Sequence, residues 1–566
     1  MVKKSSKSVT KTKKYKFYNV KRYNFIGLVG ALVCYLLSML PSLLPRPWWL
    51  QAVVSGASMA VGYGIGVLLS VAIRWLSQKE LRAQKKDQAW KIVTYAIVPA
   101  ILIMSWLGTR WQNEVRDLLG MERLSSSIIA IVLSAIGLFL LLLSIGRGIR
   151  RMARKLRAIA RKKLPPHAGA VIGFGAATLV VYWIVSGLML SNFLRVVNNA
   201  YGTRDNRAPD GITQPTEFEK SGSPESLVSW DKIGFQGRGF VGSGPSAEQI
   251  KSYTGRPAKE PIRAYAGLQT ADSPEARAEL ALAELKRTKA FERKVLVIGT
   301  ATGTGWLDPR AVDALEFMYD GDTAIVSQQY SYLPSWISFL VDKENARAAG
   351  RALYDTVIDE WSRLPKDTRP KLIVYGLSLG SFGGQAAFSG INDIRRSTDG
   401  ALFTGTPNES EVWRKTTDNR DEGSPEWQPT YKSGETVRFA STKEQILADD
   451  KNWQPSRILF VQHANDPVVW FSFDLILHEP DWLKEPRGTG VSNKTRWYPF
   501  ITFLQVGLDQ AIAESAPVGH GHYYIDTTVY AWQAVVPPKD WSTQKSEALQ
   551  NYLNDTFYNI PASSSL

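Results

Sequence analysis

Cysteine and histidine are nearly absent from this chain of 566 residues. The single cysteine, Cys34, lies inside an apolar run, so no disulfide can form within the chain and no multi-cysteine metal site can exist. No internal repeat or low-complexity tract is visible. The five histidines leave few candidates for any chemistry that needs an imidazole.

An excess of basic charge is confined to three short stretches of the chain. The formal net charge is +16, and residues 1–23, 74–91 and 147–163 together carry more positive charge than that total. The remainder of the chain therefore has a net negative charge. A nucleic-acid partner loses its main support, because the charge is not spread over a folded basic surface. Membrane lipids are the expected partner of the three basic stretches.

Long apolar runs are concentrated in the first third of the sequence. A bilayer is crossed by about 20 consecutive apolar residues, and we expect a membrane domain of five helices over residues 24–195. The predicted spans are Asn24 to Leu44, Leu50 to Ile73, Ile92 to Gly108, Ser127 to Ile145 and Ala168 to Asn192. The first is long and lacks a small-residue cleavage site, so it is expected to be retained rather than removed as a signal peptide.

The basic stretches predict the orientation of these spans. Loops rich in Lys and Arg stay in the cytoplasm, so the leader, residues 1–23, is expected to be cytoplasmic. Five spans in the plasma membrane then place everything after Phe193 on the outer side. Residues 147–163 are also typical of an amphipathic helix that lies on anionic head groups.

The rest of the chain divides into a polar segment and a second domain. Residues 196–262 are rich in Gly, Pro and Ser and predict a linker with an irregular approach segment. Its glycine-rich run, residues 234–245, lacks the Lys-Ser/Thr ending of a phosphate-binding loop. From residue 263 to 566, helical and strand-like runs alternate, which predicts a mostly parallel sheet with helices on both faces. The expected strands are Lys294–Gly299, Thr323–Ser327, Lys371–Tyr375, Ala401–Thr404 and Arg457–Val461.

The run Gly376-Leu377-Ser378-Leu379-Gly380 follows the third of these strands and precedes a small-residue helix. Strand, sharp turn and helix are the setting of a nucleophile elbow, in which glycine two residues before and after the serine avoids a steric clash. Ser378 is the predicted nucleophile. The N–H of Leu379 would then stabilise the developing oxyanion at the helix N-terminus.

A serine nucleophile needs a base and an orienting carboxylate, here in the order Ser, Asp/Glu, His. Of the five histidines, only His520 and His522 come late enough in the chain. We favour His520, because glycines flank it as in a mobile base loop, while the two tyrosines after His522 could stack and orient the loop. Asp466, in the loop after the last predicted strand, is the expected acid, with Asp474, Asp481 and Asp526 as alternatives.

Other ligands are not expected from the motifs. The run Gly299 to Gly305 is placed for a second oxyanion donor, which we assign to Thr302, and it does not match the dinucleotide fingerprint. His520 and His522 lack a third histidine or a cysteine that would complete a metal site. Neither a cofactor nor a metal is predicted.

Several long motifs in one order resemble the two-part integral-membrane α/β-hydrolases of actinobacteria. They are residues 237–245, 302–309, 334–342, 376–384, 465–470 and 519–522. The resemblance implies an envelope protein with a serine-dependent active site at Ser378.

Together these observations predict a membrane-anchored esterase, lipase or acyltransferase that acts on a lipidic or acylated envelope substrate. The alternative is a lipid- or partner-binding scaffold with an inactive hydrolase-like domain. A peptidase is a third interpretation, because a triad alone does not choose between ester and amide bonds.

Overall fold

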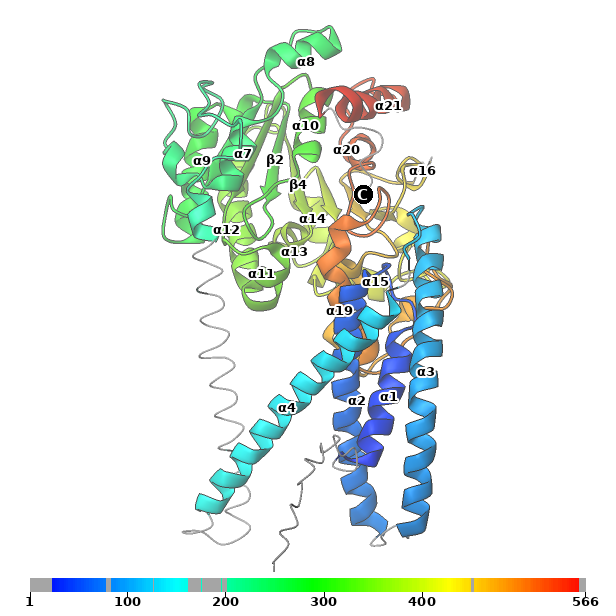
Figure 1. The fold of residues 1–566 in the computed structure, drawn as a ribbon. Helices are drawn as coiled ribbons and strands as arrows, with labels where there is room; N and C mark the ends of the chain where they lie inside the picture. The colour runs from blue at the N-terminus through cyan, green and yellow to red at the C-terminus, as the bar shows by residue number, and fades with distance from the viewer. Residues whose placement is uncertain are drawn as a thin grey trace, which may run out of the picture.

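The computed structural model describes residues 23–77, 83–125, 127–160, 201–448 and 452–558, together with the single residues Gly175 and Arg195. Figure 1 shows a group of long helices from the first third of the chain beneath a sheet covered by further helices. The basic leader, apart from Tyr23, and the fifth predicted span, apart from Gly175, fall outside the described residues.

Four helices lie among the described residues of the N-terminal part: α1 (Phe25–Ser38), α2 (Trp48–Ser77), α3 (Ala83–Leu118) and α4 (Ile128–Ala160). Among the described residues, the segments long and apolar enough to cross a membrane are Trp48–Leu76, Trp90–Leu118 and Ile128–Leu156. The second, third and fourth predicted spans therefore correspond to helices of spanning length, whereas the fifth, which apart from Gly175 lies outside the described residues, stays a prediction.

The first predicted span is too short in the structure. α1 has 14 residues, or about 21 Å at 1.5 Å per residue, against a bilayer core of about 30 Å. The predicted span ran on to Leu44, but it contains Pro41, and the residue before a proline disfavours helical backbone. The third predicted span, Ile92 to Gly108, is shorter than the helix that contains it. α3 includes Pro99 without ending there and extends beyond the predicted span at both ends.

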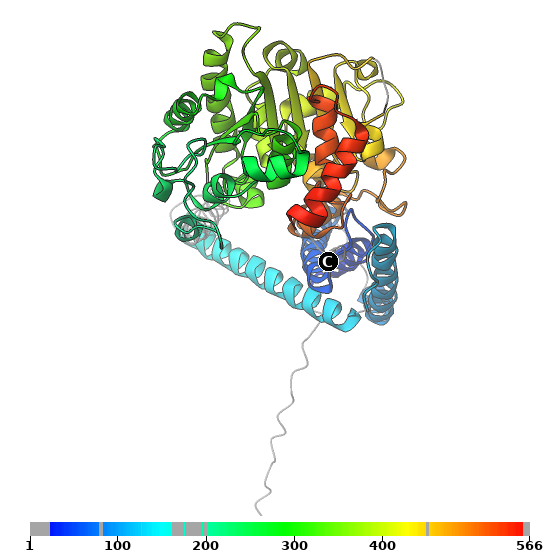
Figure 2. The same cartoon turned by 90° about the horizontal axis from the view of Figure 1, so that it is seen from above.

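Glycines allow α1 and α2 to pack backbone against backbone. A Cβ at Gly30 would lie 2.3 Å from the carbonyl oxygen of Gly62, and a Cβ at Gly66 would lie 2.3 Å from that of Ile26. Small residues at a helix interface permit this close approach in membrane proteins. α4 diverges from the other helices toward its C-terminal end in both views (Figures 1 and 2). The basic residues from Arg147 onward continue α4 as far as Ala160.

Within the described residues the second part contains a seven-stranded sheet of order β1-β3-β2-β4-β5-β7-β6, and every neighbouring pair is parallel. The strands are β1 (Ile262–Ala266), β2 (Val295–Thr300), β3 (Thr323–Gln328), β4 (Lys371–Leu377), β5 (Gly400–Thr404), β6 (Val437–Ala440) and β7 (Arg457–Val461). All five predicted strands are present. The two that were missed, β1 and β6, are edge strands, and each contains an arginine that interrupts its apolar pattern.

Helices cover both faces of the sheet, as alternate residues of β2 illustrate. Leu296 and Ile298 belong to one apolar core with α9 and α12, whereas Val295 and Val297 belong to the other core with α10 and α20. The helices are α7 (Phe235–Gly242), α8 (Ala247–Thr254), α9 (Pro274–Arg287), α10 (Pro309–Met318), α11 (Ser335–Val341), α12 (Lys343–Ser362), α13 (Leu379–Gln385), α14 (Ile391–Ser397), α15 (Glu411–Asp418), α16 (Lys443–Ile446), α17 (Pro467–Trp470), α18 (Asp481–Lys484), α19 (Ile501–Asp509), α20 (Thr528–Val535) and α21 (Thr543–Tyr552).

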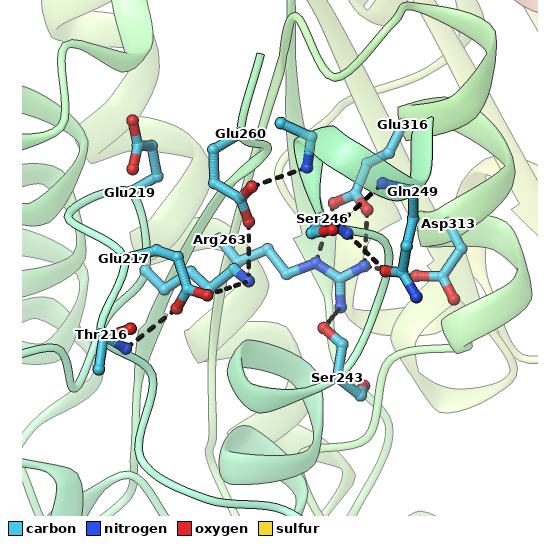
Figure 3. Close-up of polar contacts among 12 residues, drawn as sticks. Thr216, Glu217, Glu219, Ser243, Ser246, Gln249, Glu260, Arg263, Asp313 and Glu316 are labelled. Atoms are coloured by element: carbon cyan, nitrogen blue, oxygen red, sulfur yellow. Dashed lines mark hydrogen bonds and ion pairs between the residues drawn. The ribbon is translucent and has the colours of Figure 1, made fainter. Parts of the chain in front are cut away.

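The polar segment before the sheet is ordered from residue 201 and packs on β1. Its glycine-rich run forms α7, and Gly237 lies so close to Tyr265 that a Cβ there would be 2.4 Å from the ring. Figure 3 shows how the segment is fastened to the sheet. The buried guanidinium of Arg263 donates to the carboxylate of Glu316 at 2.7 and 2.9 Å and to the Ser243 carbonyl at 2.9 Å.

A buried contact joins the two parts. Arg46, just before α2, donates from Nε to Oδ1 of Asp509 at 2.6 Å, and both side chains are fully buried. Asp509 is the last residue of α19, which lies above α1 and α2 (Figure 1). In the same helix, the Gln505 amide donates to the Leu40 carbonyl at 3.0 Å. The long helices therefore meet the sheet domain through α19.

Candidate active site

Ser378 occupies a strained turn between β4 and α13. Its backbone angles, φ 56° and ψ −125°, are in a region that residues with a Cβ rarely adopt. The turn is held by hydrogen bonds on both sides: the Ser378 N–H donates to the Thr404 carbonyl at 2.8 Å, and its carbonyl accepts from the Phe382 N–H at 3.1 Å. The side chain is thereby presented at the end of a central strand.

The glycines on either side of Ser378 are required by the close approach of the backbone. A Cβ at Gly376 would lie 2.5 Å from the carbonyl oxygen of Gly380, and a Cβ at Gly380 would lie 2.2 Å from that of Thr300. Any larger residue would push α13 away from the sheet. The geometry expected of a nucleophile elbow is therefore present.

Asp466 follows β7 and begins α17. Its Oδ1 accepts the Val468 N–H at 2.8 Å, and its Oδ2 accepts both Nδ1 of His522 at 2.6 Å and the Tyr524 hydroxyl at 2.5 Å. Because a carboxylate at neutral pH can only accept, Nδ1 of His522 carries the hydrogen. Nε2 of the same ring is then left with its lone pair.

The ring of His522 is held from several sides. A Cβ at Gly405 would lie 2.4 Å from the imidazole, so glycine is needed behind it, and the His522 N–H donates to the Ala513 carbonyl at 2.9 Å. Its Nε2 is buried without a hydrogen-bond partner among the described residues, and His522 lines the same two cavities as Ser378. Burial alone would lower the pKa of His522, but the charge and hydrogen bond of Asp466, with help from Glu514, raise the pKa above its ordinary value.

The structure places His522, and not His520, against Asp466, which reverses the preference drawn from the sequence. Nδ1 of His520 lies 3.2 Å from the Asn465 amide nitrogen, and burial lowers the pKa of His520. The glycines beside His520 serve the turn instead: at Gly521, φ is 57° and a Cβ would lie 2.6 Å from the Ala513 carbonyl oxygen. That turn carries the chain to His522.

A third histidine, His463, lies beneath the site without reaching Asp466 by a hydrogen bond. Its Nδ1 lies 2.9 Å from the Gly521 carbonyl oxygen, and its ring stacks on Tyr524 with centroids 4.3 Å apart. Burial lowers the pKa of His463 to about 4, so it is neutral at physiological pH. His463 precedes the region of the chain in which the sequence predicts the base, and the tyrosines after His522 are expected from the sequence only to stack. The Tyr524 hydroxyl on Asp466 had no sequence signal beyond that position.

The two predicted oxyanion donors have different outcomes. Leu379 is the first residue of α13, so its N–H has no carbonyl one turn earlier in the helix to donate to. The Thr302 N–H, in contrast, donates to the Trp306 carbonyl at 2.9 Å, which closes the loop after β2 and leaves this donor engaged. The next N–H, of Gly303, donates to Ser335 Oγ at 3.3 Å, and Ser335 lines both cavities at Ser378.

Two cavities of about 520 and 670 Å³ meet at Ser378 and His522. The smaller one is lined mainly by apolar side chains: Phe339, Leu379, Pro407, Val468, Ala511 and Ala513. The larger one is more polar and includes Arg204, Gln236, Asp308, Arg310, Tyr523 and Tyr558. The described residues contain no group of three His, Cys, Asp or Glu side chains placed to hold a metal ion.

Comparison with known proteins agrees with this architecture. No curated protein and no solved structure matches the chain. Two family models match it: one described as the N-terminus of an alpha/beta-hydrolase family, over residues 39–245, and one described as the alpha/beta-hydrolase family, over residues 262–549. The second match spans half of the chain, from β1 into α21, and contains the elbow, Asp466 and His522. The chain therefore belongs to this two-part alpha/beta-hydrolase family.

Proposed function

We propose that the protein is a membrane-anchored serine esterase or acyltransferase with Ser378 as nucleophile, His522 as base and Asp466 as the acid that orients it. One observation carries the proposal. His522 donates its Nδ1–H to Asp466, its Nε2 has no partner among the described residues, and His522 lines the same cavities as the strained Ser378. The Nε2 of His463 also has no partner in the described part of the chain, but its Nδ1 lies against the Gly521 carbonyl instead of a carboxylate, and His463 is not among the described residues that line these cavities.

The geometry supports an acyl-serine mechanism. Ser378 Oγ attacks the ester carbonyl carbon as its proton passes to His522 Nε2, and Asp466 stabilises the resulting imidazolium. The Leu379 N–H, together with the hydroxyl of Ser335, stabilises the oxyanion. Collapse breaks the C–O bond, and His522 returns the proton to the leaving alcohol. Water or an acceptor hydroxyl then attacks the acyl-serine by the reverse path.

The two cavities favour an ester with one apolar arm and one polar arm. The acyl chain fits the smaller, apolar cavity, and the alcohol fits the larger one with its arginines and tyrosines. Val468 and Ala513 line the smaller cavity and also pack with Leu44, Val115 and Leu119 of the N-terminal part. The apolar arm is thus on the side of the long helices, as expected for a lipidic substrate.

The described helices also support anchoring with the hydrolase domain outside. Apolar side chains face away from the bundle, such as Leu68 with 70% and Leu133 with 66% of its surface exposed. Figure 1 shows the end of α2, the start of α3 and the end of α4 on the side away from the sheet. The basic stretch 74–91 includes the end of α2 and the start of α3, and the stretch 147–163 includes the end of α4. The leader ends at Tyr23, whose ring lies 4.3 Å from the guanidinium of Arg147 in α4. By the positive-inside rule that side is cytoplasmic. The envelope substrate expected from the sequence remains a prediction.

A substrate series with purified full-length protein in detergent tests this function. We expect hydrolysis of long-chain acyl esters in preference to acetyl esters, slower cleavage of the matching amides, and complete loss of both activities in Ser378→Ala. Ser389→Ala is the matched control, because Ser389 is exposed and its hydroxyl donates to Asp393, away from both cavities at Ser378. Activity that survives in Ser378→Ala would contradict the assignment of the nucleophile, whereas folded wild type without activity on any ester would favour the inactive scaffold.

A further inference from the structure

A third cavity, of about 210 Å³, lies where the long helices meet the sheet domain. Its walls come from the start of α2, the end of α3 and the start of α4. It has no residue in common with the two cavities at Ser378. Met39 and Ile131 form apolar wall, while Arg46, Gln112 and Arg116 supply nitrogen donors.

Arg46 is a buried cation, and one of its guanidinium nitrogens, Nη2, is not used in a hydrogen bond to a described residue. Its side chain has no exposed surface; Nε donates to Asp509 at 2.6 Å and Nη1 donates to the Gln51 amide oxygen at 2.9 Å. Nη2 is buried and has no partner among the described residues. A guanidinium cannot lose its proton in a protein, so this N–H remains a donor without an acceptor.

Gln112 presents a second unused donor in the same wall. Its amide oxygen accepts the backbone N–H of Arg46 at 2.8 Å, which fixes the direction of the amide. The nitrogen of that amide is buried and, like Nη2 of Arg46, has no partner in the described part of the chain. Two buried donors in one cavity call for an acceptor with several oxygen atoms.

The charge of the cavity specifies that acceptor further. Arg46 and Arg116 are among the described residues that line it, and no carboxylate is. Asp509 balances Arg46, so Arg116 leaves an excess of positive charge. The Nε of Arg116 donates to the Glu122 carbonyl at 2.7 Å, which leaves the two Nη groups without a hydrogen bond to another described residue. Arginine forks match phosphate oxygens in geometry and in charge.

The position of the cavity favours a lipid as the source of the phosphate. It lies at the ends of two helices of spanning length, Trp48–Leu76 and Trp90–Leu118. Trp48 and Trp49, each about half exposed at 46% and 47%, mark the level at which aromatic rings meet head groups. We propose that this cavity binds the phosphate of an anionic lipid head group, with an acyl chain along the apolar wall by Ile131.

The bound lipid would lie next to the catalytic region without being the substrate. Asp509, which Arg46 holds, is followed directly by Gln510–Ser515, and residues of that segment line the smaller catalytic cavity. The cavity itself has no serine elbow and no histidine among its described lining residues. The proposal is therefore independent of the esterase mechanism and has its own test.

The test measures binding of short-chain phosphatidic acid to the full-length protein in detergent by native mass spectrometry. Diacylglycerol with the same chains lacks the phosphate, and inorganic phosphate lacks the chains. Gln112→Glu keeps the oxygen that accepts from Arg46 but replaces the free N–H₂ with a carboxylate oxygen. Arg116→Gln removes the unbalanced charge. Arg123→Gln is the matched control, because Arg123 is exposed and paired with Asp117 outside the cavity.

We expect phosphatidic acid to bind wild type and Arg123→Gln alike, and at least tenfold more weakly to each cavity variant. Stronger binding of phosphatidic acid than of inorganic phosphate identifies a lipid ligand; equal binding of both, with the same dependence on the variants, identifies a free phosphate-type anion in the same site. Equal binding of diacylglycerol, or unchanged affinity in folded Gln112→Glu and Arg116→Gln, would overturn the proposal. The thermal midpoint of each variant reports whether it is folded.

Discussion

His522 lines the cavities at Ser378, and Arg46 lines the third cavity, at the start of α2. Each has a buried side-chain nitrogen without a partner among the described residues, but these two nitrogens have opposite chemistry. In His522, Asp466 fixes the hydrogen on Nδ1, so Nε2 is an acceptor that can take a proton. In Arg46, every nitrogen carries hydrogen, so Nη2 can only donate. The first arrangement suits turnover and the second suits binding.

The comparison also shows how the partners of a group decide its role. His520 and His522 are two residues apart, and both are histidines in a glycine-rich turn. His522 has a buried carboxylate on one nitrogen, whereas His520 has an amide. The predictions below test these differences, beginning with the largest expected effect.

Separate replacement of His520 and His522 should give the largest difference in kcat between two variants. His522→Ala removes the base, and we expect kcat to fall by roughly 10⁶-fold, as when a triad histidine is lost. His520→Ala should retain activity within about tenfold, because it removes a contact to Asn465 but leaves the proposed base, His522, in place. Ester hydrolysis by the two variants is the measurement. Equal losses would mean that the contact with Asp466 does not identify the base.

Asp466→Asn should have the next largest effect. The amide keeps the shape of the carboxylate but does not hold Nδ1–H with a charge, so the imidazole is free to take the wrong tautomer. A loss of about 10⁴-fold in kcat is expected. Asp474→Asn is the control, because Asp474 is exposed on the following segment. Similar activity in the two variants would remove Asp466 from the site.

The buried ion pair at the junction should matter for stability more than for chemistry. Arg46→Met leaves Asp509 buried without its cation, which destabilises a fold by about 3–5 kcal/mol. Arg46→Met/Asp509→Leu removes both charges and should recover most of that loss. Thermal unfolding in detergent measures both variants. A double variant that is no more stable than the single one would show that the pair is not what holds α19 to Arg46.

The pH profile should reflect the carboxylate on His522. The base must be neutral, so activity falls as the pH decreases through the pKa of His522, which Asp466 raises above the ordinary value of about 6.5. In the residual activity of Asp466→Asn, we expect the acid limb of kcat/KM to move down by about one pH unit. In Tyr524→Phe, Oδ2 of Asp466 loses one of its two donors and interacts more strongly with the imidazolium of His522, so the limb should move up. A limb that is the same in all three proteins would contradict this assignment.

The elements that the sequence predicted well are those with local signals. The five expected strands are all present, and each is an apolar run that can be recognised without reference to the rest of the chain. The elbow could be predicted because the steric conflict at Gly376 and Gly380 depends on neighbouring residues in the sequence. Such features need no knowledge of distant contacts.

The features that the sequence did not determine depend on contacts between distant segments. β1 contains Arg263, whose charge is compensated by Glu316 far along the chain, so its apolar pattern was interrupted. The glycines around His520 predict a mobile loop for the base, but in the structure Gly521 forms a tight turn that packs against the Ala513 carbonyl. The Thr302 N–H is engaged by the Trp306 carbonyl because of the shape of one loop, which composition does not reveal.

The most direct test of the catalytic assignment is the rate of labelling by a fluorophosphonate, which reacts with an activated serine. In detergent-solubilised full-length protein, we expect rapid labelling of wild type and of His520→Ala, labelling slowed by several orders of magnitude in His522→Ala, and none in Ser378→Ala. Rapid labelling of His522→Ala together with loss of labelling in His520→Ala would contradict the assignment of the base. Labelling that persists in Ser378→Ala would contradict the nucleophile.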